Sequence, residues 1–321
     1  MATKLGKIGI ALGGGAARGL AHIGALRALE EAGMAPSFIT GTSAGALVGG
    51  LYAAGVPVSE LERIAREMDE SESSKLIDLT WARGSLVAGR SVEEFLRTIV
   101  GDVLIENLPK PFMATAVDIN TGAGFLFDGG RLVDAIRASI SIPGIFEPVS
   151  ANGRYLVDGG VRLNLPLRVL NRWRPDTIVG VGLTRAPWRD DSWNQTEIDR
   201  KRPPGQDDES NIWERLKDRF GGGADRVEED GKDLPGLRFL LARTFVILTS
   251  QMEQQEVDRA KPDLYVDLDV HDIALWEFWR GEEAMQMGYE QTRDAISEFL
   301  RREEGPRGAW RRFIRRLRRR A

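Results

Sequence analysis

Short apolar runs alternate with amphipathic stretches over the first part of the chain. Ile8–Leu12 is a compact apolar run followed by three glycines, which predicts a buried strand and a tight turn. Residues 17–32 carry apolar side chains three and four positions apart, which predicts a helix that stops at Gly33. Residues 37–54 repeat this order of strand, turn and helix. Such successive units predict a parallel sheet with helices on its faces.

The remaining pattern extends this α/β arrangement to residue 300. Strands are predicted at 112–118, 124–127, 155–157, 177–183 and 264–266, and helices over much of 59–108 and at 131–139, 237–259 and 282–300. Residues 186–235 are polar and rich in Pro, Gly and charge, which predicts a flexible insertion with one short helix near 212–220. We therefore expect one α/β domain over 1–300, with a mostly parallel central sheet, and a separate tail at 301–321.

Composition removes several kinds of chemistry. The 321 residues include no cysteine and only two histidines, His22 and His271. Disulfides, zinc–thiolate centres, iron–sulfur clusters and thiol catalysis are therefore excluded, and a histidine-rich metal site is disfavoured. No uncharged apolar stretch approaches the ~20 residues that a bilayer crossing needs. The N-terminal apolar run is also too short for a secretory signal, so we expect a cytoplasmic protein.

The most informative turn is Gly41-Thr42-Ser43-Ala44-Gly45, between a predicted strand and a predicted helix. A serine in this position, with glycine two residues to either side, is typical of a nucleophile elbow. The glycines permit a sharp turn, and the amino end of the following helix favours negative charge that develops near the serine. A serine that only caps the helix is the alternative. The context favours Ser43 as the nucleophile of an acyl hydrolase.

The base that would activate Ser43 has two candidate assignments. Ser43, Asp158 and His271 follow the chain order of an α/β-hydrolase triad, but only one strand–helix unit precedes Ser43 and His271 lies in an acidic, surface-like stretch. Alternatively, Asp158 acts directly, because it follows a predicted strand and ligands gather at the carboxyl ends of parallel strands. Burial there would raise its pKa above the reference value of about 3.9. The same tripeptide recurs at Asp128, before a helix, where it suits a turn.

A glycine-rich loop between the first strand and helix is the predicted oxyanion hole, with Gly13, Gly14 and Gly15 as backbone donors and Arg18 as a nearby cation. One such backbone donor stabilises an oxyanion by roughly 3 kcal/mol. A P-loop would end in Gly-Lys-Ser/Thr, which is missing here, and the glycine spacing of a dinucleotide-binding loop fails at Ala16 or at Arg18. Nucleotide binding is therefore disfavoured.

Several spaced motifs together resemble the bacterial patatin-like phospholipases. They are Gly13 to Gly19 with Ala21-His22-Ile23-Gly24, Gly41 to Gly45, Ala138 to Phe146, Val157 to Gly160, and Asn164-Leu165-Pro166. The resemblance is good over about residues 5–185, weaker over 237–300, and absent from the insertion and the tail.

This resemblance implies a three-layer α/β/α sandwich, a Ser43–Asp158 dyad, an oxyanion hole in the glycine loop, and lipid acyl-ester substrates of the phospholipase A or lysophospholipase kind. It also implies that no metal or cofactor takes part and that His22 is structural, at the start of its helix. A small-ester or thioester hydrolase on the same dyad stays open, as does a non-catalytic regulatory protein that keeps the fold. Intact Ser43 and Asp158 argue against the last alternative.

The tail at 301–321 holds ten Arg and two Glu, a net charge of about +8 against about −12 for the rest of the chain. Its apolar side chains share one helical face, which arginines surround: Trp310, Phe313, Ile314 and Leu317. This pattern is typical of a helix that lies on anionic lipid, so residues 309–320 are predicted to contact the inner face of a membrane peripherally. A solvated tail is the main alternative, and nucleic-acid contact is less favoured. The oligomeric state is left open.

Overall fold

The computed structural model describes residues 5–68, 89–183 apart from Asn152, and 237–304, together with two short strands at 227–229 and 232–234. The described strands are β1 (Ile8–Leu12), β2 (Phe38–Gly41), β3 (Phe112–Asp118), β4 (Gly124–Phe127), β5 (Val149–Ala151), β6 (Arg154–Asp158), β7 (Thr177–Gly182), β8 (Val227–Glu229), β9 (Lys232–Leu234) and β10 (Leu264–Asp267). The described helices are α1 (Ala21–Glu31), α2 (Ala44–Ala53), α3 (Val58–Glu67), α5 (Arg90–Val100), α6 (Leu132–Ser139), α8 (Leu237–Ala260) and α9 (Gly281–Glu303). Short 3₁₀ turns occur at η2 (Ala16–Leu20), η4 (Ile105–Asn107), η5 (Gly159–Val161), η6 (Arg168–Trp173) and η7 (Phe278–Arg280).

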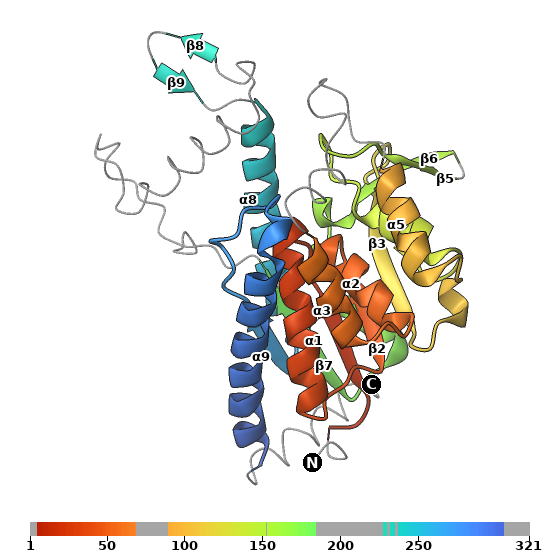
Figure 1. Ribbon diagram of the computed structural model, residues 1–321, viewed down its shortest axis with the longest axis vertical. Coiled ribbons are helices and arrows are strands. Elements are labelled where there is room, and N and C mark those ends of the chain that lie inside the picture. The colour runs from red at the N-terminus through yellow and green to blue at the C-terminus, as the bar shows by residue number, and fades with distance from the viewer. Residues whose placement is uncertain are drawn as a thin grey trace.

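Within the described residues, eight strands form one central sheet in the order β10-β7-β1-β2-β3-β6-β5, and β4 pairs with β3 (Figure 1). The strands from β10 to β3 in this order are parallel to one another. Every residue of β1, β3 and β7 is buried, as strands covered on both faces require.

Helices and turns cover both faces of this sheet. On one face α1, α2 and α9 enclose the larger apolar core, which includes Ile10, Leu26 and Ile39. On the other face η6 and the end of α8 cover a smaller cluster around Leu170 and Ile178. This is a three-layer α/β/α arrangement, so the predicted fold class is confirmed.

Strand β3 joins the parallel part of the sheet to an antiparallel part. Gly41, at the end of β2, pairs with Ala114, and Asp158, at the end of the antiparallel β6, pairs with Ala116. Strand β4 pairs with these same β3 residues and therefore takes the opposite edge. Hence β2 and β6 approach each other end to end along one edge of β3. The register brings the elbow after Gly41 and the carboxylate of Asp158 to the same place.

The observed elements differ from the predicted ones at a few places. The strands predicted at 112–118 and 124–127 have the observed bounds, whereas β5 was not predicted. Inside the predicted insertion at 186–235, β8 and β9 pair as a short hairpin, which the polar composition did not indicate. The rest of that range and residues 305–321 lie outside the described part of the chain. Helix α9 continues to Glu303, past the domain end predicted at residue 300.

None of the helices in the described part of the chain combines the length and apolarity that a membrane crossing needs.

Candidate functional site

Ser43 occupies a strained turn between β2 and α2. Its backbone has φ 53° and ψ −121°, a region that costs a non-glycine residue about 1–3 kcal/mol. The flanking glycines allow this turn because the backbone passes so close to them. A Cβ at Gly41 would lie 2.4 Å from the Gly45 carbonyl oxygen, and one at Gly45 would lie 2.2 Å from that of Leu12. The strand–turn–helix geometry is that of a nucleophile elbow.

Polar side chains hold this turn against β3 and α6. The Ser43 N–H donates to the Oγ of Ser139, the last residue of α6, at 2.9 Å. The Oγ1 atoms of Thr42 and Thr115 are 2.7 Å apart, and Thr42 Oγ1 also donates to the Leu163 carbonyl at 2.9 Å. Ser43 is only 4% exposed, so the elbow is fixed in the interior.

Asp158 ends β6 with its side chain fully buried. Its Oδ1 accepts the Gly160 N–H at 2.7 Å, and its own N–H donates to the Ser141 carbonyl at 2.9 Å. Burial raises the pKa of this carboxyl to about 7, against the opposing effects of the Ser43 hydroxyl and the Gly160 N–H. A carboxylate with a pKa near neutrality is a far stronger base than an exposed aspartate.

The contact between Ser43 and Asp158 is close but not a well-formed hydrogen bond. The Ser43 hydroxyl lowers the pKa of Asp158 as a donor would, so the two side chains are neighbours. Yet Asp158 Oδ2 is buried and meets no donor at hydrogen-bond geometry among the described residues. Bonds between catalytic groups are often long without substrate and tighten when it binds.

The glycine loop differs in detail from its predicted role. The N–H of Gly13 donates to the Val181 carbonyl at 3.0 Å, and that of Gly14 donates to the Asn164 carbonyl at 3.2 Å. These two predicted oxyanion donors are therefore engaged within the fold and fix the loop instead. Among the described residues, the N–H of Gly15 meets no such acceptor, so it is the one glycine amide left to serve a ligand.

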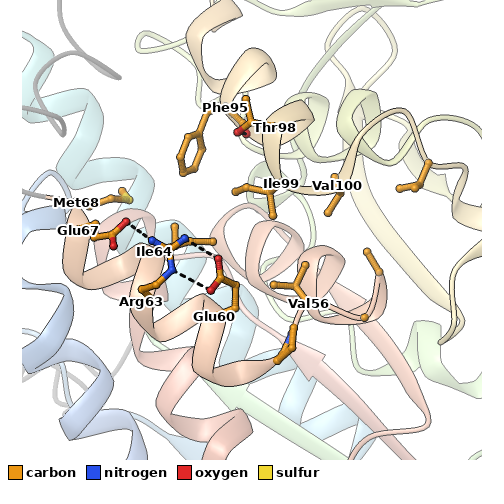
Figure 2. Close-up of a pocket in the computed structure, with 14 residues that line it drawn as sticks. Val56, Glu60, Arg63, Ile64, Glu67, Met68, Phe95, Thr98, Ile99 and Val100 are labelled. Atoms are coloured by element: carbon orange, nitrogen blue, oxygen red, sulfur yellow. Dashed lines mark hydrogen bonds and ion pairs between the residues drawn. The ribbon is translucent and has the colours of Figure 1, made fainter.

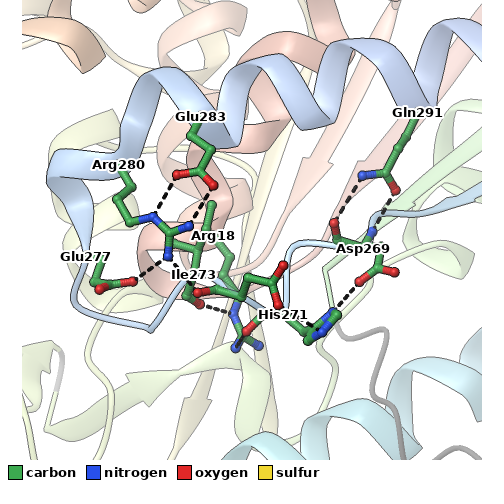
Figure 3. Close-up of polar contacts among 9 residues, drawn as sticks. Arg18, Asp269, His271, Ile273, Glu277, Arg280, Glu283 and Gln291 are labelled. Carbon is green, nitrogen blue, oxygen red and sulfur yellow. Dashed lines mark hydrogen bonds and ion pairs between the residues drawn. The ribbon is translucent and has the colours of Figure 1, made fainter. Parts of the chain in front are cut away.

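Arg18 is also placed differently from the predicted cation at an oxyanion. Its Nε donates to the Ile273 carbonyl at 2.7 Å and its Nη2 donates to the His271 carbonyl at 2.9 Å (Figure 3). These bonds tie the turn after β1 to the loop between β10 and α9. In this arrangement Arg18 anchors that loop.

Neither histidine forms a hydrogen bond with Ser43. The ring of His271 is 44% exposed and lies between two acidic side chains of its own loop, with Nδ1 bonded to Asp269 and Nε2 at 3.0 Å from Asp272 (Figure 3). His22 is fully buried near the start of α1, and its Nε2 lies 2.8 Å from the Gly13 carbonyl oxygen. Burial lowers its pKa to about 4, so it is neutral at pH 7 and donates to that carbonyl from Nε2.

Asp128, the aspartate of the second Asp-Gly-Gly sequence, lies at the surface. Its carboxylate forms an ion pair of 2.7 Å with Arg172 and is 44% exposed. The two copies of the tripeptide thus have different environments, and only that of Asp158 is desolvated.

Two polar residues near the elbow were given no role by the sequence alone. One is Ser139, which binds the Ser43 amide. The other is Asn164, whose Nδ2 donates to the carboxylate of Glu253 at 2.8 Å and lies 3.4 Å from the Gly14 carbonyl oxygen. Both residues lie within the spaced motifs described above. A polar residue between apolar ones in such a motif is the sequence feature that could have identified them.

A cavity of about 590 Å³ lies elsewhere, between α3 and α5 (Figure 2). Apolar side chains such as Ile64 and Phe95 line much of it, and Arg63 bridges Glu60 and Glu67 along α3. The cavity begins at the carboxyl end of α2, whereas Ser43 lies just before the amino end of α2. Since α2 has ten residues, the two places are about 15 Å apart along the helix. This cavity is therefore separate from the candidate site.

Known proteins resemble this chain most clearly in its first half. The sequence model of the patatin-like phospholipase family matches residues 10–171, which include both Ser43 and Asp158. An uncharacterised NTE family protein of Mycobacterium bovis is 38% identical over 193 residues, 59% of this chain and 53% of the relative. Another from Mycobacterium tuberculosis is 31% identical over 90% of this chain and 46% of its own length. This chain thus spans about half the length of these relatives.

A relative from Drosophila melanogaster, the neuropathy target esterase sws, is 34% identical over 54% of this chain and 13% of its own length. Among solved structures, VipD from Legionella pneumophila superposes with a TM-score of 0.45 at 15% identity, over 92% of this chain and 67% of VipD. The family model alone covers half of the chain, and on that ground the chain belongs to the patatin-like phospholipase family.

Proposed function

We propose that this protein hydrolyses lipid acyl esters, with Ser43 as nucleophile and Asp158 as its base. The observation that carries the proposal is the fully buried Asp158 carboxyl next to Ser43, with its pKa raised to about 7. The strained backbone of Ser43 is a second support, because such strain is characteristic of functional positions.

The chemistry follows from these positions. Asp158 takes the proton of the Ser43 hydroxyl as its Oγ attacks the carbonyl carbon of the ester, and a tetrahedral intermediate forms. When the intermediate collapses, Asp158 returns the proton to the leaving alcohol and an acyl-serine remains. Asp158 then takes a proton from an attacking water and returns it to Ser43 as the fatty acid leaves. One carboxyl thus serves as base and acid in both halves of the reaction.

The oxyanion hole is proposed at the N–H of Gly15, beside the amino end of α2. A Cβ at Gly14 would lie 3.1 Å from Ser43 Cβ, so the glycine loop is adjacent to the nucleophile. The aligned peptide dipoles of α2 add positive potential at Ser43, the residue before its first turn. Both effects favour the charge that develops on the carbonyl oxygen.

Lipid esters are the proposed substrates because the family is one of phospholipases and one relative is named an esterase. We propose further that the arginine-rich residues 309–320 hold the enzyme at an anionic membrane surface on the cytoplasmic side. If lipid esters are not hydrolysed, substrate profiling with small esters and thioesters would show whether the same dyad acts on those substrates instead.

The test compares the wild type, Ser43→Ala and Asp158→Asn with a serine-reactive fluorophosphonate and with phospholipid, lysophospholipid and p-nitrophenyl esters. We expect the wild type to be labelled and to release fatty acid, Ser43→Ala to do neither, and Asp158→Asn to lose most activity. Equal hydrolysis by the wild type and Ser43→Ala would refute the assignment of the nucleophile. Labelling without any lipid hydrolysis would refute the substrate class and leave the dyad.

A further inference from the structure

Glu253 lies on α8, far along the chain from the elbow and outside the residues that match the family model. Its side chain is fully buried, and its carboxylate oxygens accept hydrogen bonds from Asn164 Nδ2 at 2.8 Å and from the Tyr265 hydroxyl at 2.9 Å. A Cβ at Gly182 would lie 2.1 Å from Glu253 Oε1, so the carboxylate is tightly enclosed. Burial of a carboxylate is costly without such partners, so its position is strongly specified.

Asn164 in turn holds Gly14 on both sides. Its backbone carbonyl accepts the Gly14 N–H at 3.2 Å, and its Nδ2 approaches the Gly14 carbonyl oxygen at 3.4 Å. The Gly14 carbonyl and the Gly15 N–H belong to one planar, trans peptide unit, so they point in opposite directions. A contact that fixes the Gly14 carbonyl therefore also fixes the direction of the Gly15 N–H.

Glu253 decides which end of the Asn164 amide meets Gly14. An asparagine amide can turn over, which exchanges its NH₂ for its oxygen. The Glu253 carboxylate only accepts hydrogen bonds when ionised, so it selects the orientation in which Nδ2 lies between Glu253 and Gly14. With the amide reversed, Asn164 Oδ1 would face two other oxygens and the peptide before Gly15 would be pushed away.

We propose that Glu253 is a positioning residue for the oxyanion hole: through Asn164 it sets the peptide plane that aims the Gly15 N–H at the reacting carbonyl oxygen. The inference rests on the proposed function, since it assigns Gly15 as a donor in that reaction. It adds a residue of α8, from the C-terminal part of the chain, to a site otherwise built from residues 13–164.

The experiment uses the full chain and a soluble p-nitrophenyl ester, with kcat and KM measured separately. Glu253→Met removes both acceptors and is expected to lower kcat about 100-fold, the size of one lost oxyanion donor, with KM nearly unchanged. Glu253→Gln still offers an oxygen to Asn164 and an NH₂ to the Tyr265 oxygen, so kcat should recover to within about threefold of the wild type. Such a recovery would show that the hydrogen bond from Asn164 to residue 253, and not the charge of Glu253, positions the oxyanion hole.

Glu256 is the matched control. It lies three residues further along α8, is 4% exposed, and accepts from the Arg168 N–H at 2.9 Å and from Arg168 Nε at 2.8 Å. Glu256→Met should lose stability in urea much as Glu253→Met does, but keep kcat within about threefold. Equal losses of kcat in both variants would reduce Glu253 to a structural role and overturn the proposal.

Asn164→Leu provides a second test should Glu253→Met fail to fold. It should lower kcat by a similar factor, and a double variant with Glu253→Met should lose no more than either change alone, because the two residues act in series. If Asn164→Leu or Glu253→Met keeps the wild-type kcat, the inference about Glu253 is refuted. If Ser43→Ala is inactive in the same assay, the proposed function still holds.

Discussion

Replacement of Asp158 by asparagine should stabilise the protein as it inactivates the site. The pKa of Asp158 is about 7 in the folded protein, whereas an aspartate in the unfolded chain has a pKa of about 3.9. Below pH ~4 the carboxyl is protonated in both states and does not affect stability. Between pH ~4 and ~7 the folded state keeps a proton that the unfolded state releases, so the stability falls as the pH rises.

The size of this effect follows from the difference in pKa. About three pKa units at 1.36 kcal/mol each give a cost of about 4 kcal/mol, fully present above pH ~7. Asparagine carries no charge and keeps an oxygen that accepts the Gly160 N–H. Its NH₂ takes the position of Oδ2, which accepts no hydrogen bond from the described residues of the wild type. Allowing for imperfect replacement, we expect Asp158→Asn to raise the free energy of unfolding by about 2–4 kcal/mol at pH 8 and by almost nothing at pH 4.

Urea unfolding at pH 4.5, 6 and 8 measures this difference, with the slope against urea checked to be the same for both proteins. The matched control is Asp128→Asn, which removes an exposed carboxylate and its ion pair with Arg172 and should change the free energy of unfolding by less than about 1 kcal/mol. A stability difference between wild type and Asp158→Asn that is equal at all three pH values, or a wild type that is the more stable at pH 8, would refute the argument.

Four other outcomes are expected. The kcat/KM of the wild type should rise with pH and level off above an apparent pKa near 7, because Asp158 acts as a base; a profile that is flat from pH 5 to 9 contradicts this. Ser43→Gly should be more stable than Ser43→Ala by about 1 kcal/mol in urea unfolding, since glycine relieves the strain at φ 53°, and both should be inactive. His271→Ala and Asp128→Asn should keep ester hydrolysis near the wild-type rate, whereas a loss in His271→Ala as large as that in Ser43→Ala would restore the triad. Deletion of residues 305–321 should reduce co-sedimentation with anionic vesicles at low salt and spare soluble-ester hydrolysis; equal binding by both proteins would show that the tail is not the anchor.

The sequence predicted the elements of the parallel part well for a physical reason. β1 and β3 are buried along their whole length and consist mostly of apolar residues, because both faces of the sheet are covered there. Their ends are marked in the sequence, since Gly13 follows β1 and Asp118 ends β3. β5 was missed because it is only three residues long and partly exposed, so it has no distinct apolar pattern. The pairing of β8 with β9 lies among polar residues, where periodicity carries no signal.

For the site, the sequence indicated two residues, Ser43 and Asp158, that are neighbours in the structure, but the argument that selected them was incomplete. Asp158 was expected at the carboxyl end of a parallel strand, but β6 is antiparallel to β3 and meets β2 from the opposite direction. The engagement of the Gly13 and Gly14 amides depends on the neighbouring segments that carry Val181 and Asn164, which no local pattern reveals. Glu253 was overlooked because a glutamate in a helix is ordinarily solvated, and only the tertiary fold shows that it is buried.

The end-to-end meeting of β2 and β6 also bears on how the proposed activity would be lost on heating. β6 is held to β3 by three residue pairs and to β5 by three more, and β5 is the outermost strand of the sheet within the described part of the chain. Such an edge hairpin can detach in a local opening that costs less free energy than unfolding the parallel strands around β1. Each opening would carry Asp158 away from Ser43 while the core stays folded. Loss of the proposed activity would then precede the loss of helical circular dichroism. A cross-link between the hairpin and β3 would prolong that activity at high temperature more than it raises the Tm.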